Sequence, residues 1–434
     1  MQPSIKFLTS AVLATTLGLF SLSCIDRAQS ASPKTQTRAS LMGRESRAIA
    51  QTPPAAKKVV SSAALDANRR FGFALLQAQL ANHPKTENLF ISPTSISQAL
   101  AMVYLGSAGK TRQGMEQTLQ SGDMSPEALT QGNVAIKNLL ENPGDEKVQL
   151  TVANSLWVNE GASLKDSFVE QNRSQYRARV SILNFADPRT LDRINNWAKR
   201  STKGKIPQIL DQIDPQGEVI VANAVYFKGD WSRPFEKKLT TDRPFQLDEK
   251  RRKPLPFMNQ GGKYSYLETP QFQAIRLSYG DTKRFGMYVF LPKGDLTTWT
   301  KGLTDETWNQ WMGQFASKQG TIALPKFKIN YTSKLNDSLK ALGMADAFTK
   351  QADFSAMSTN NVLISNVTHK TILEVDETGT EAAAVTTIEV VATSAQILPD
   401  KPFNMVVDRP FFVAIVDQQT GLPFFMGQIS DPGR

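Results

Sequence analysis

The chain has 434 residues, of which 21% are charged and 40% apolar, with a single cysteine and two histidines. This length can bury a substantial core, but one cysteine forms neither an internal disulfide nor a cysteine-built zinc site. The formal net charge of +10 raises the question of an anionic partner such as nucleic acid. Residues 1–60 hold eight basic and two acidic side chains, which leaves 42 basic and 38 acidic ones beyond them. The body is therefore close to neutral, and its charge gives no support for nucleic-acid binding.

Residues 1–23 are predicted to be a signal peptide. The uncharged, mostly apolar run at 7–22 suits a secretory leader and is shorter than the ~20 residues that span a bilayer. A small-residue site places cleavage as late as residue 30. A competing lipoprotein-type site would leave Cys24 as a lipidated N-terminus, although Ser21 stands where such sites usually have leucine.

Residues 24–61 are predicted to be a disordered tether, because they are rich in Ala, Ser, Thr, Gln and basic residues and lack apolar periodicity. Together with the leader, this segment predicts a protein secreted to the extracellular space or the periplasm. If Cys24 is lipidated, the protein would instead be tethered to a membrane.

The first part of the body is predicted to be helical. Apolar residues at steps of three and four indicate an amphipathic helix beginning near Ser62, at Leu65, Phe71, Leu75, Leu76 and Leu80. Ser92 followed by Pro93 is typical of a helix start, and this second helix is expected to stop at Gly106.

The later part of the body is predicted to be rich in strands. The β-rich runs lie at 219–227, 285–291, 321–329, 362–375 and 411–416. Helices before strands, without a break in composition, indicate one α+β domain over residues 62–434.

The familiar catalytic motifs are missing from the sequence. Gly109-Lys110-Thr111 resembles the end of a phosphate-binding loop, but Tyr104 stands where that loop requires glycine. No G-x-S-x-G or H-E-x-x-H motif occurs. His83 lies in an expected turn, and His369 lies in a strand-like run that favours a structural hydrogen bond. We therefore expect no enzyme activity, no metal and no cofactor.

The segment between Glu377 and Pro402 has an unusual pattern. Alternate residues from Thr380 to Val390 are uncharged, whereas Glu381 and Glu389 fall on the other face. This alternation predicts a strand with one buried face. An ordinary strand of a resting sheet is one interpretation. A strand that slides into a narrow gap is the other, because small residues stand at its start.

Several longer motifs resemble those of the serpin family, in that family's order. They lie at Asn88–Ile96, Leu105–Thr111, Asn195–Trp197, Thr202–Ile206, Ala222–Trp231, Gly379–Ala384 and Phe424–Gly427. The resemblance covers the chain from about Ser62 to its end. It implies a single α+β domain with three β-sheets, eight or nine helices and an exposed reactive-centre loop. We expect a secreted or lipid-anchored bacterial member that acts as a monomer.

The resemblance also implies suicide inhibition of serine endopeptidases. Residues 378–400 would be the bait, and after cleavage they would insert as a new strand of the main sheet, as is known for the family. The hinge of this loop matches Glu377, Gly379, Thr380, Glu381, Ala382, Ala383 and Ala384. Val385 is larger than the alanine often found next in inhibitory members.

Two further groups of residues match the family individually. Trp231 and Lys326, together with Glu377, match the breach, where insertion begins, and an ion pair between Lys326 and Glu377 is a hypothesis. The shutter, a hydrogen-bonded cluster beneath the point where the sheet opens, matches Ser92, Ser95, Asn223 and His369.

The family's usual spacing from Glu377 places the attacked bond between Thr393 and Ser394. The loop is a few residues longer than is common, so the window also includes Ala392, Ala395 and Gln396.

The composition of the loop narrows the class of target protease. No basic or aromatic residue occurs in 378–400, which favours an elastase-like or subtilisin-like serine protease over a trypsin-like one. A papain-like cysteine protease is a further candidate target. A glycosaminoglycan cofactor is not expected, because Lys137 is the only basic residue in 125–143. The competing function is a non-inhibitory serpin that acts as a carrier or chaperone.

Overall fold

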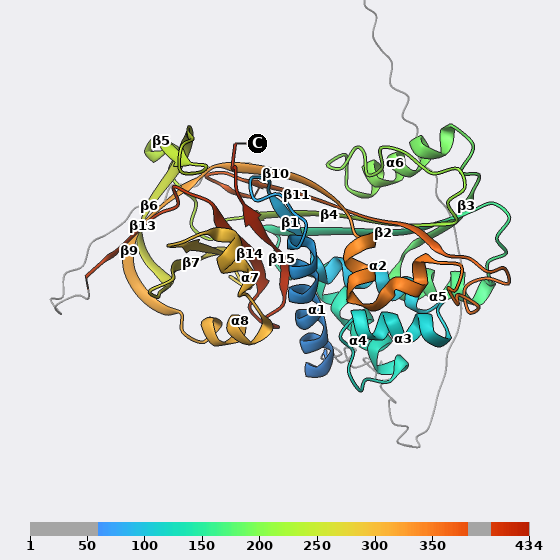
Figure 1. Ribbon diagram of the computed structural model, residues 1–434. Helices are drawn as coiled ribbons and strands as arrows, with labels where there is room; N and C mark the ends of the chain where they lie inside the picture. The colour runs from blue at the N-terminus through green and yellow to red at the C-terminus, as the bar shows by residue number, and fades with distance from the viewer. Residues whose placement is uncertain (1–59, 381–400, 434) are drawn as a thin grey trace, which may run out of the picture. The chain divides into compact units, whose positions relative to one another are not determined.

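The computed structural model describes residues 60–380 and 401–433, all within one compact unit, Lys57–Arg434 (Figure 1). Its helices are α1 (Ser62–Leu80), α2 (Pro93–Tyr104), α3 (Gly109–Thr118), α4 (Pro126–Glu141), α5 (Asp166–Tyr176), α6 (Arg189–Ser201), α7 (Leu296–Lys301), α8 (Asp305–Met312) and α9 (Asn336–Leu339). Short helical turns are η1 (Lys237–Leu239), η2 (Lys340–Met344) and η3 (Ala345–Phe348). Within the described ranges, no helix is long and apolar enough to cross a membrane.

The strands form two hydrogen-bonded sheets among the described residues. The six-stranded sheet contains β2 (Val148–Asn159), β3 (Arg179–Leu183), β4 (Val219–Asp230), β10 (Phe327–Lys334), β11 (Ile364–Val375) and β12 (Gly379–Thr380). The second sheet contains β1 (Leu89–Ile91), β5 (Thr241–Gln246), β6 (Arg252–Glu268), β7 (Phe272–Tyr279), β8 (Phe285–Pro292), β9 (Ala316–Pro325), β13 (Phe403–Val406), β14 (Phe411–Asp417) and β15 (Pro423–Ile429).

The sequence analysis expected three sheets, and the long strand β6 explains why two of them form one hydrogen-bonded network. Its first residues pair with β5, its middle with β9 and its last with β7. One strand of 17 residues therefore connects what would otherwise be separate sheets. The α+β class and the helical first part are as predicted, and α1 begins at Ser62 with its apolar stripe buried.

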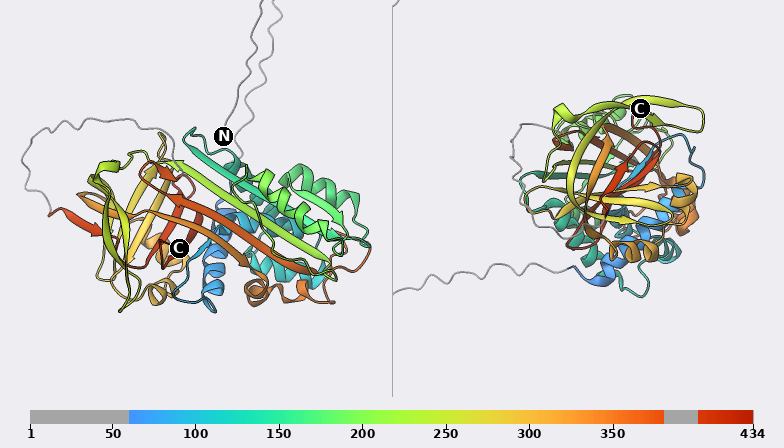
Figure 2. Two further views of the ribbon diagram at one scale, coloured as in Figure 1. Left: turned by 90° about the horizontal axis from the view of Figure 1, so that it is seen from above. Right: turned by 90° about the vertical axis from the view of Figure 1, so that its left-hand side faces the viewer.

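The six-stranded sheet has helices on both faces, and the alternation of side chains along β4 explains this (Figures 1 and 2). Ile220, Ala222 and Ala224 belong to the apolar cluster that includes Ile194 of α6. Residues between them face the other way, toward α2, every residue of which is buried. A strand covered on both faces reads as a continuous apolar run, as residues 219–227 do.

Two local predictions differ from the structure. The run at 321–329 is divided between β9 and β10 at Lys326, because Pro325 ends one strand and the chain passes to the other sheet. Ser92 does precede α2, but its side chain makes no capping hydrogen bond, and its backbone N–H instead donates to the ring of His369.

Candidate functional site

The seam between β11 and β4 is the place where an additional strand could enter the six-stranded sheet. These two strands pair in parallel, from Ile364 opposite Val219 to Ile372 opposite Tyr226. Their outer neighbours β10 and β2 each pair antiparallel. A strand inserted antiparallel to both β11 and β4 would replace one parallel pairing by two antiparallel ones, which are slightly more stable per residue.

The short strand β12 is the beginning of a strand with that direction. Gly379 and Thr380 pair antiparallel with Asp230 and Gly229, beyond the end of the β11–β4 pairing. Thr380 is fully buried, and its Oγ1 lies 2.8 Å from Oη of Tyr279. The sequence analysis placed these two hinge residues in an exposed loop. The structure corrects this, because their backbone extends the hydrogen bonding of β4 and is covered by the second sheet.

Gly379 is required where the chain turns back onto β4. A Cβ atom at this position would lie 2.2 Å from the carbonyl oxygen of Gly229, and a backbone atom within a sheet cannot move away. The turn is held by Asp376, whose Oδ1 accepts from the backbone N–H groups of Thr378 and Gly379. Close backbone approach therefore fixes where the inserted segment begins.

The predicted breach residues Lys326 and Glu377 form an ion pair, with Nζ 2.8 Å from Oε2. Glu377 is buried, and its other carboxylate oxygen accepts from Oγ1 of Thr240 at 2.8 Å. Burial by itself would raise the pKa of Glu377, but hydrogen bonds, first of all from Lys326, lower it below its usual value. The carboxylate is thus ionised at neutral pH. It connects the segment that follows β11 to Thr240, just after η1, and to Lys326, between β9 and β10.

Trp231 covers the same turn. Its indole Nε1–H donates to the carbonyl of Asp376 at 2.9 Å, and its backbone N–H donates to the carbonyl of Thr378 at 2.8 Å. The indole stacks on Tyr279 with ring centroids 4.4 Å apart. Trp231 and Tyr279 therefore hold the hinge from one side while the ion pair holds it from the other.

The four predicted shutter residues lie together across the middle of the seam. Asn223 of β4 is opposite His369 of β11 in the register, and its Oδ1 accepts from His369 Nδ1 at 2.5 Å and from Ser95 Oγ at 2.7 Å. The amide nitrogen of Asn223 donates to Asn154 Oδ1 at 2.5 Å and to the Ser95 carbonyl at 3.3 Å. Asn223 thus connects both strands of the seam to α2.

His369 is held as the neutral tautomer with its proton on Nδ1. The backbone N–H of Ser92 donates to Nε2 at 3.0 Å, which requires a lone pair there, and Nδ1–H donates to Asn223. The ring is fully buried, and this burial lowers its pKa to about 3. His369 therefore has a structural role, as its place in a strand predicted.

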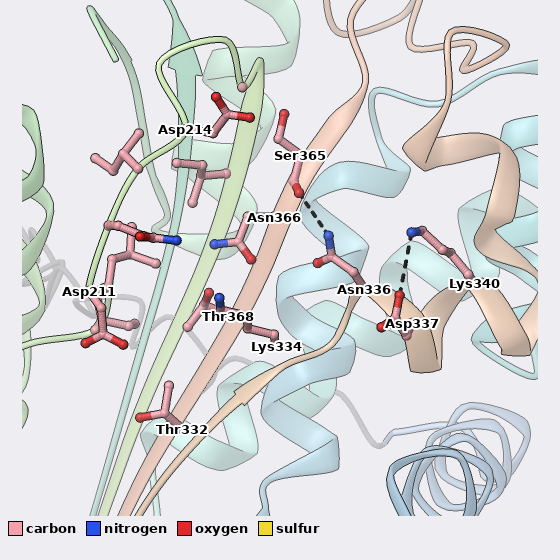
Figure 3. Close-up of a pocket in the computed structure, with 16 residues that line it drawn as sticks. Asp211, Asp214, Thr332, Lys334, Asn336, Asp337, Lys340, Ser365, Asn366 and Thr368 are labelled. Carbon is pink, nitrogen blue, oxygen red and sulfur yellow. Dashed lines mark hydrogen bonds and ion pairs between the residues drawn. The ribbon is translucent and has the colours of Figure 1, made fainter. Parts of the chain in front are cut away.

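A polar cavity of about 570 Å³ lies over the seam at the end opposite β12 (Figure 3). Its floor includes Ile220 of β4 and Thr368 of β11, and residues 209–217 that follow α6 form one wall. On the other wall, the side-chain amide of Asn336 donates to the carbonyl of Ser365 at 2.9 Å. The cavity leaves room on this face for the side chains of a strand that enters the seam.

Several predicted site residues lie outside the described part of the chain, so their positions stay predictions. They are Cys24, Glu381, Ala382, Ala383, Ala384, Ala392, Thr393, Ser394, Ala395 and Gln396.

Sequence reasoning missed Tyr279, Thr240 and Asn154, which complete the breach and the shutter. Each comes from an element far along the chain from its partner and belongs to none of the recognised motifs. No strand was predicted at 148–159, so Asn154 of β2 could not be singled out as a polar residue within one.

Comparison with known proteins identifies the family. A family model described as serpin (serine protease inhibitor) matches residues 66–432. The chain is 33% identical over 373 residues to corticosteroid-binding globulin of Pongo abelii, covering 84% of this chain and 90% of that protein. It is 32% identical over 382 residues to leukocyte elastase inhibitor of Homo sapiens, covering 84% and 98%.

Solved structures give the same result. The native state of the thermophilic serpin Tengpin has a TM-score of 0.79 and 32% identity, covering 86% of this chain and 95% of that one. Human thyroxine-binding globulin has a TM-score of 0.77 and 25% identity, covering 86% and 100%. The similar proteins are thus named inhibitors or carrier globulins, not enzymes. With this fold and with its motifs in order over the whole body, the chain belongs to the serpin family.

Proposed function

We propose that this chain is a suicide inhibitor of serine endopeptidases, acting as a monomer by inserting its cleaved loop into the β11–β4 seam. The observation that carries the proposal is β12, since Gly379 and Thr380 already pair antiparallel with β4 at the end of that seam. A strand continuing from Thr380 would run along the seam toward the shutter. The uncharged face predicted for the following residues suits such a buried path.

The chemistry of trapping comes from the protease. Its serine Oγ attacks the carbonyl carbon of the scissile residue, the peptide C–N bond breaks, and the new amine leaves on the C-terminal segment. Insertion then carries the ester-linked protease away before water hydrolyses the acyl bond. Within the inhibitor, the inserted strand separates Asn223 from His369 and replaces their contact by backbone pairing on both sides.

The proposed target is an elastase-like or subtilisin-like protease with a small apolar S1 pocket. The absence of basic and aromatic residues from 378–400 supports this class, and Thr393–Ser394 is the proposed bond within the window 392–396. A papain-like cysteine protease could be trapped by the same insertion through a thioester. Secretion is also proposed, from the leader at residues 1–23, with a membrane tether if Cys24 is lipidated.

A carrier function is the second candidate, because the similar proteins include corticosteroid-binding globulin and thyroxine-binding globulin. A carrier would have the same fold, but its cleaved loop would not insert into the β11–β4 seam and trap the protease. The two functions differ in what happens when a protease cuts the loop.

The test is to incubate the protein with pancreatic elastase, subtilisin and trypsin and to analyse the products by denaturing electrophoresis and mass spectrometry. The proposal predicts a complex with elastase or subtilisin that survives SDS, together with a released 41-residue peptide, 394–434. Trypsin is the control, because it finds no basic residue in 378–400, and cleavage of the loop by elastase or subtilisin without any complex would contradict inhibition and favour the carrier.

A matched pair of variants at Thr380 tests whether complex formation with the protease requires insertion into the β11–β4 seam. Thr380→Val and Thr380→Arg both remove the hydrogen bond to Tyr279, but only arginine brings a charge into a fully buried position. Thr380→Val is expected to keep most of the complex formation, whereas Thr380→Arg is expected to be cleaved as a substrate. Equal complex formation by both variants would contradict insertion through this point.

A further inference from the structure

We propose that the exposed face of α6 binds an anionic phospholipid bilayer, by electrostatic attraction at the level of the headgroups. Helix α6 is the outer layer on its side of the six-stranded sheet (Figures 1 and 2). Its inner face is buried, and Ile194, Trp197 and Ala198 belong to the same apolar cluster as residues of β4. The outer face is therefore the part of α6 that can meet a partner.

The positive charge of the body is concentrated on this helix and on the turn that follows it. Residues 189–205 hold six basic side chains and one acidic one, a net charge of +5. The remainder of 61–434 holds 36 basic and 37 acidic side chains, a net charge of −1. An anionic surface would thus attract the protein through α6 and would orient it, because the rest of the body offers no net attraction.

The helical period places the cations opposite the buried side of α6. Ile194 and Trp197 are buried, whereas Arg193 and Arg200, seven residues apart, lie together on the exposed side. At about 1.5 Å per residue, these two arginines are separated by about 10 Å along the helix axis. Lys203 is exposed in the turn that follows and extends the row. A row of this length can contact more than one headgroup.

Three of these cations have no partner within the protein. Lys199, Arg200 and Lys203 are exposed and form no ion pair with any described residue. Arg189, by contrast, pairs with Asp187, with Nη2 2.9 Å from Oδ2. The carbonyl groups at a helix C-terminus favour cations in the last turn, which accounts for Lys199 and Arg200 but not for Lys203 beyond the helix. The three charges are therefore available to an external anion.

The shape and composition of the face favour a bilayer as the partner. It is the convex side of a helix, and none of the exposed residues of α6 is apolar, so binding would stay at the headgroups and involve no insertion. The predicted tether, residues 24–61, has the same sign, with seven basic and two acidic side chains. If Cys24 is lipidated, the lipid anchor and the basic face would act together.

Binding through α6 would leave the loop-bearing end of the molecule free. Strand β13, which begins just after the bait loop, lies at the far end of the molecule from α6 (Figures 1 and 2). A bilayer that contacts α6 would therefore not cover this end. A protease in solution could still reach it.

The probe is a pair of vesicle preparations, one of phosphatidylcholine alone and one with one third phosphatidylglycerol. The full chain is sedimented with each. We expect binding to the anionic vesicles only, weakened at least about tenfold when the salt is raised from about 0.1 M to about 0.5 M. No binding to the anionic vesicles, or equal binding to both preparations, would overturn the proposal.

A triple variant, Lys199→Gln with Arg200→Gln and Lys203→Gln, locates the binding on α6. Each basic side chain near an anionic surface contributes about fivefold at low salt, so removal of all three is expected to weaken binding at least about twentyfold. The tether is unchanged in this variant, so its charge cannot account for the loss. Arg200→Gln alone, with an expected loss of about fivefold, serves if the triple variant does not fold.

The matched control is a second triple variant, Lys165→Gln with Lys301→Gln and Lys350→Gln. These lysines are also exposed and unpaired among the described residues, but they lie outside α6 and its turn. The control changes the net charge by the same amount and is expected to weaken binding less than about threefold. Equal losses in the two triple variants would contradict a site on α6.

A soluble polymer separates a bilayer from other polyanions. If dextran sulfate binds the chain through Lys199, Arg200 and Lys203 while the anionic vesicles do not, the partner is a soluble polyanion and the bilayer proposal is wrong. No protease enters these tests, so their outcome is independent of the proposed function.

Discussion

The breach and the shutter both hold the β11–β4 seam closed, but they do so with opposite chemistry. The breach depends on charge, since Lys326 is about one-third exposed and pairs with the carboxylate of the buried Glu377. The shutter is neutral and entirely buried, with Asn223 accepting from and donating to side chains on β11, α2 and β2.

This difference separates the two regions energetically. Water can solvate Lys326 when the breach opens, so the cost of breaking its ion pair is small. No water reaches Asn223 or His369, so each broken hydrogen bond there leaves a buried group unpaired. We infer that the breach is the easier place for the seam to begin opening and that the shutter sets the resistance to further opening.

The largest expected effect is that of Asn223→Ala. It leaves buried groups of His369 and Ser95 unpaired and removes the partner of the half-buried Asn154 amide, and we expect a loss of about 4 kcal/mol in stability toward urea. Asn366→Ala is the matched control, because this residue lies on β11 but lines the polar cavity over the seam, and its effect should stay within about 0.5 kcal/mol. If both variants lose a similar amount of unfolding free energy, the shutter does not stabilise the seam more than its surroundings do.

The next effect is that of Glu377→Lys, which places a second cation beside Lys326 and releases the turn that ends in Gly379. We expect a loss of about 3 kcal/mol and polymers after warming, detected by native electrophoresis. Glu374→Lys is the control, since its pair with Lys328 has a similar N···O distance, 3.0 Å against 2.8 Å, but is exposed to solvent. If the Glu377→Lys protein stays as monomeric as this control, the breach does not keep the β11–β4 seam closed.

Acid distinguishes the two regions without any substitution. The folded protein excludes a proton from His369, whose pKa is about 3, whereas the unfolded chain takes one up below about pH 6.5. Stability is therefore complete above pH 6.5 and falls by about 1.4 kcal/mol per unit as the pH decreases, or about 2 kcal/mol by pH 5. The lowered pKa of Glu377 means that the breach loses its contribution only at more acidic pH. Urea unfolding of the native protein and of His369→Gln measures this, and an equal slope in both would contradict it.

The smallest effect is expected for Lys326→Met. Glu377 keeps its hydrogen bond from Thr240, and solvent already weakens the ion pair, so the loss should be about 1 kcal/mol or less. Raising the salt concentration should narrow the difference between this variant and the native protein. A loss as large as that of Asn223→Ala would mean that the breach, not the shutter, limits opening.

The sequence predicted the residues of these two regions better than their surroundings. The resemblance to serpins located Asn223, His369, Lys326 and Glu377. The structure pairs Lys326 with Glu377, as hypothesised, and joins Asn223 to His369 within the expected cluster. Tyr279, Thr240 and Asn154 could not be found in this way, because contacts between distant elements depend on tertiary packing that no local pattern records.

The starting point of the inserted strand was also beyond sequence reasoning. The alternation from Thr380 onward has one uncharged face, but alternation does not state where pairing begins. The fit of Gly379 against the carbonyl of Gly229 fixes that point, and it leaves Thr380 buried beside Tyr279. In the sequence, the only sign of such a backbone contact is the glycine itself.

The most direct test of insertion is to lock the seam with a reversible disulfide. Ala224 and Lys370 are paired in the parallel register of β4 and β11, so cysteines at both positions, with Cys24→Ser, can link the two strands. We predict that the reduced protein forms the SDS-resistant complex with an elastase or subtilisin and that the oxidised protein is cleaved without it. If the oxidised protein traps the protease as well as the reduced one does, the loop does not enter the β11–β4 seam.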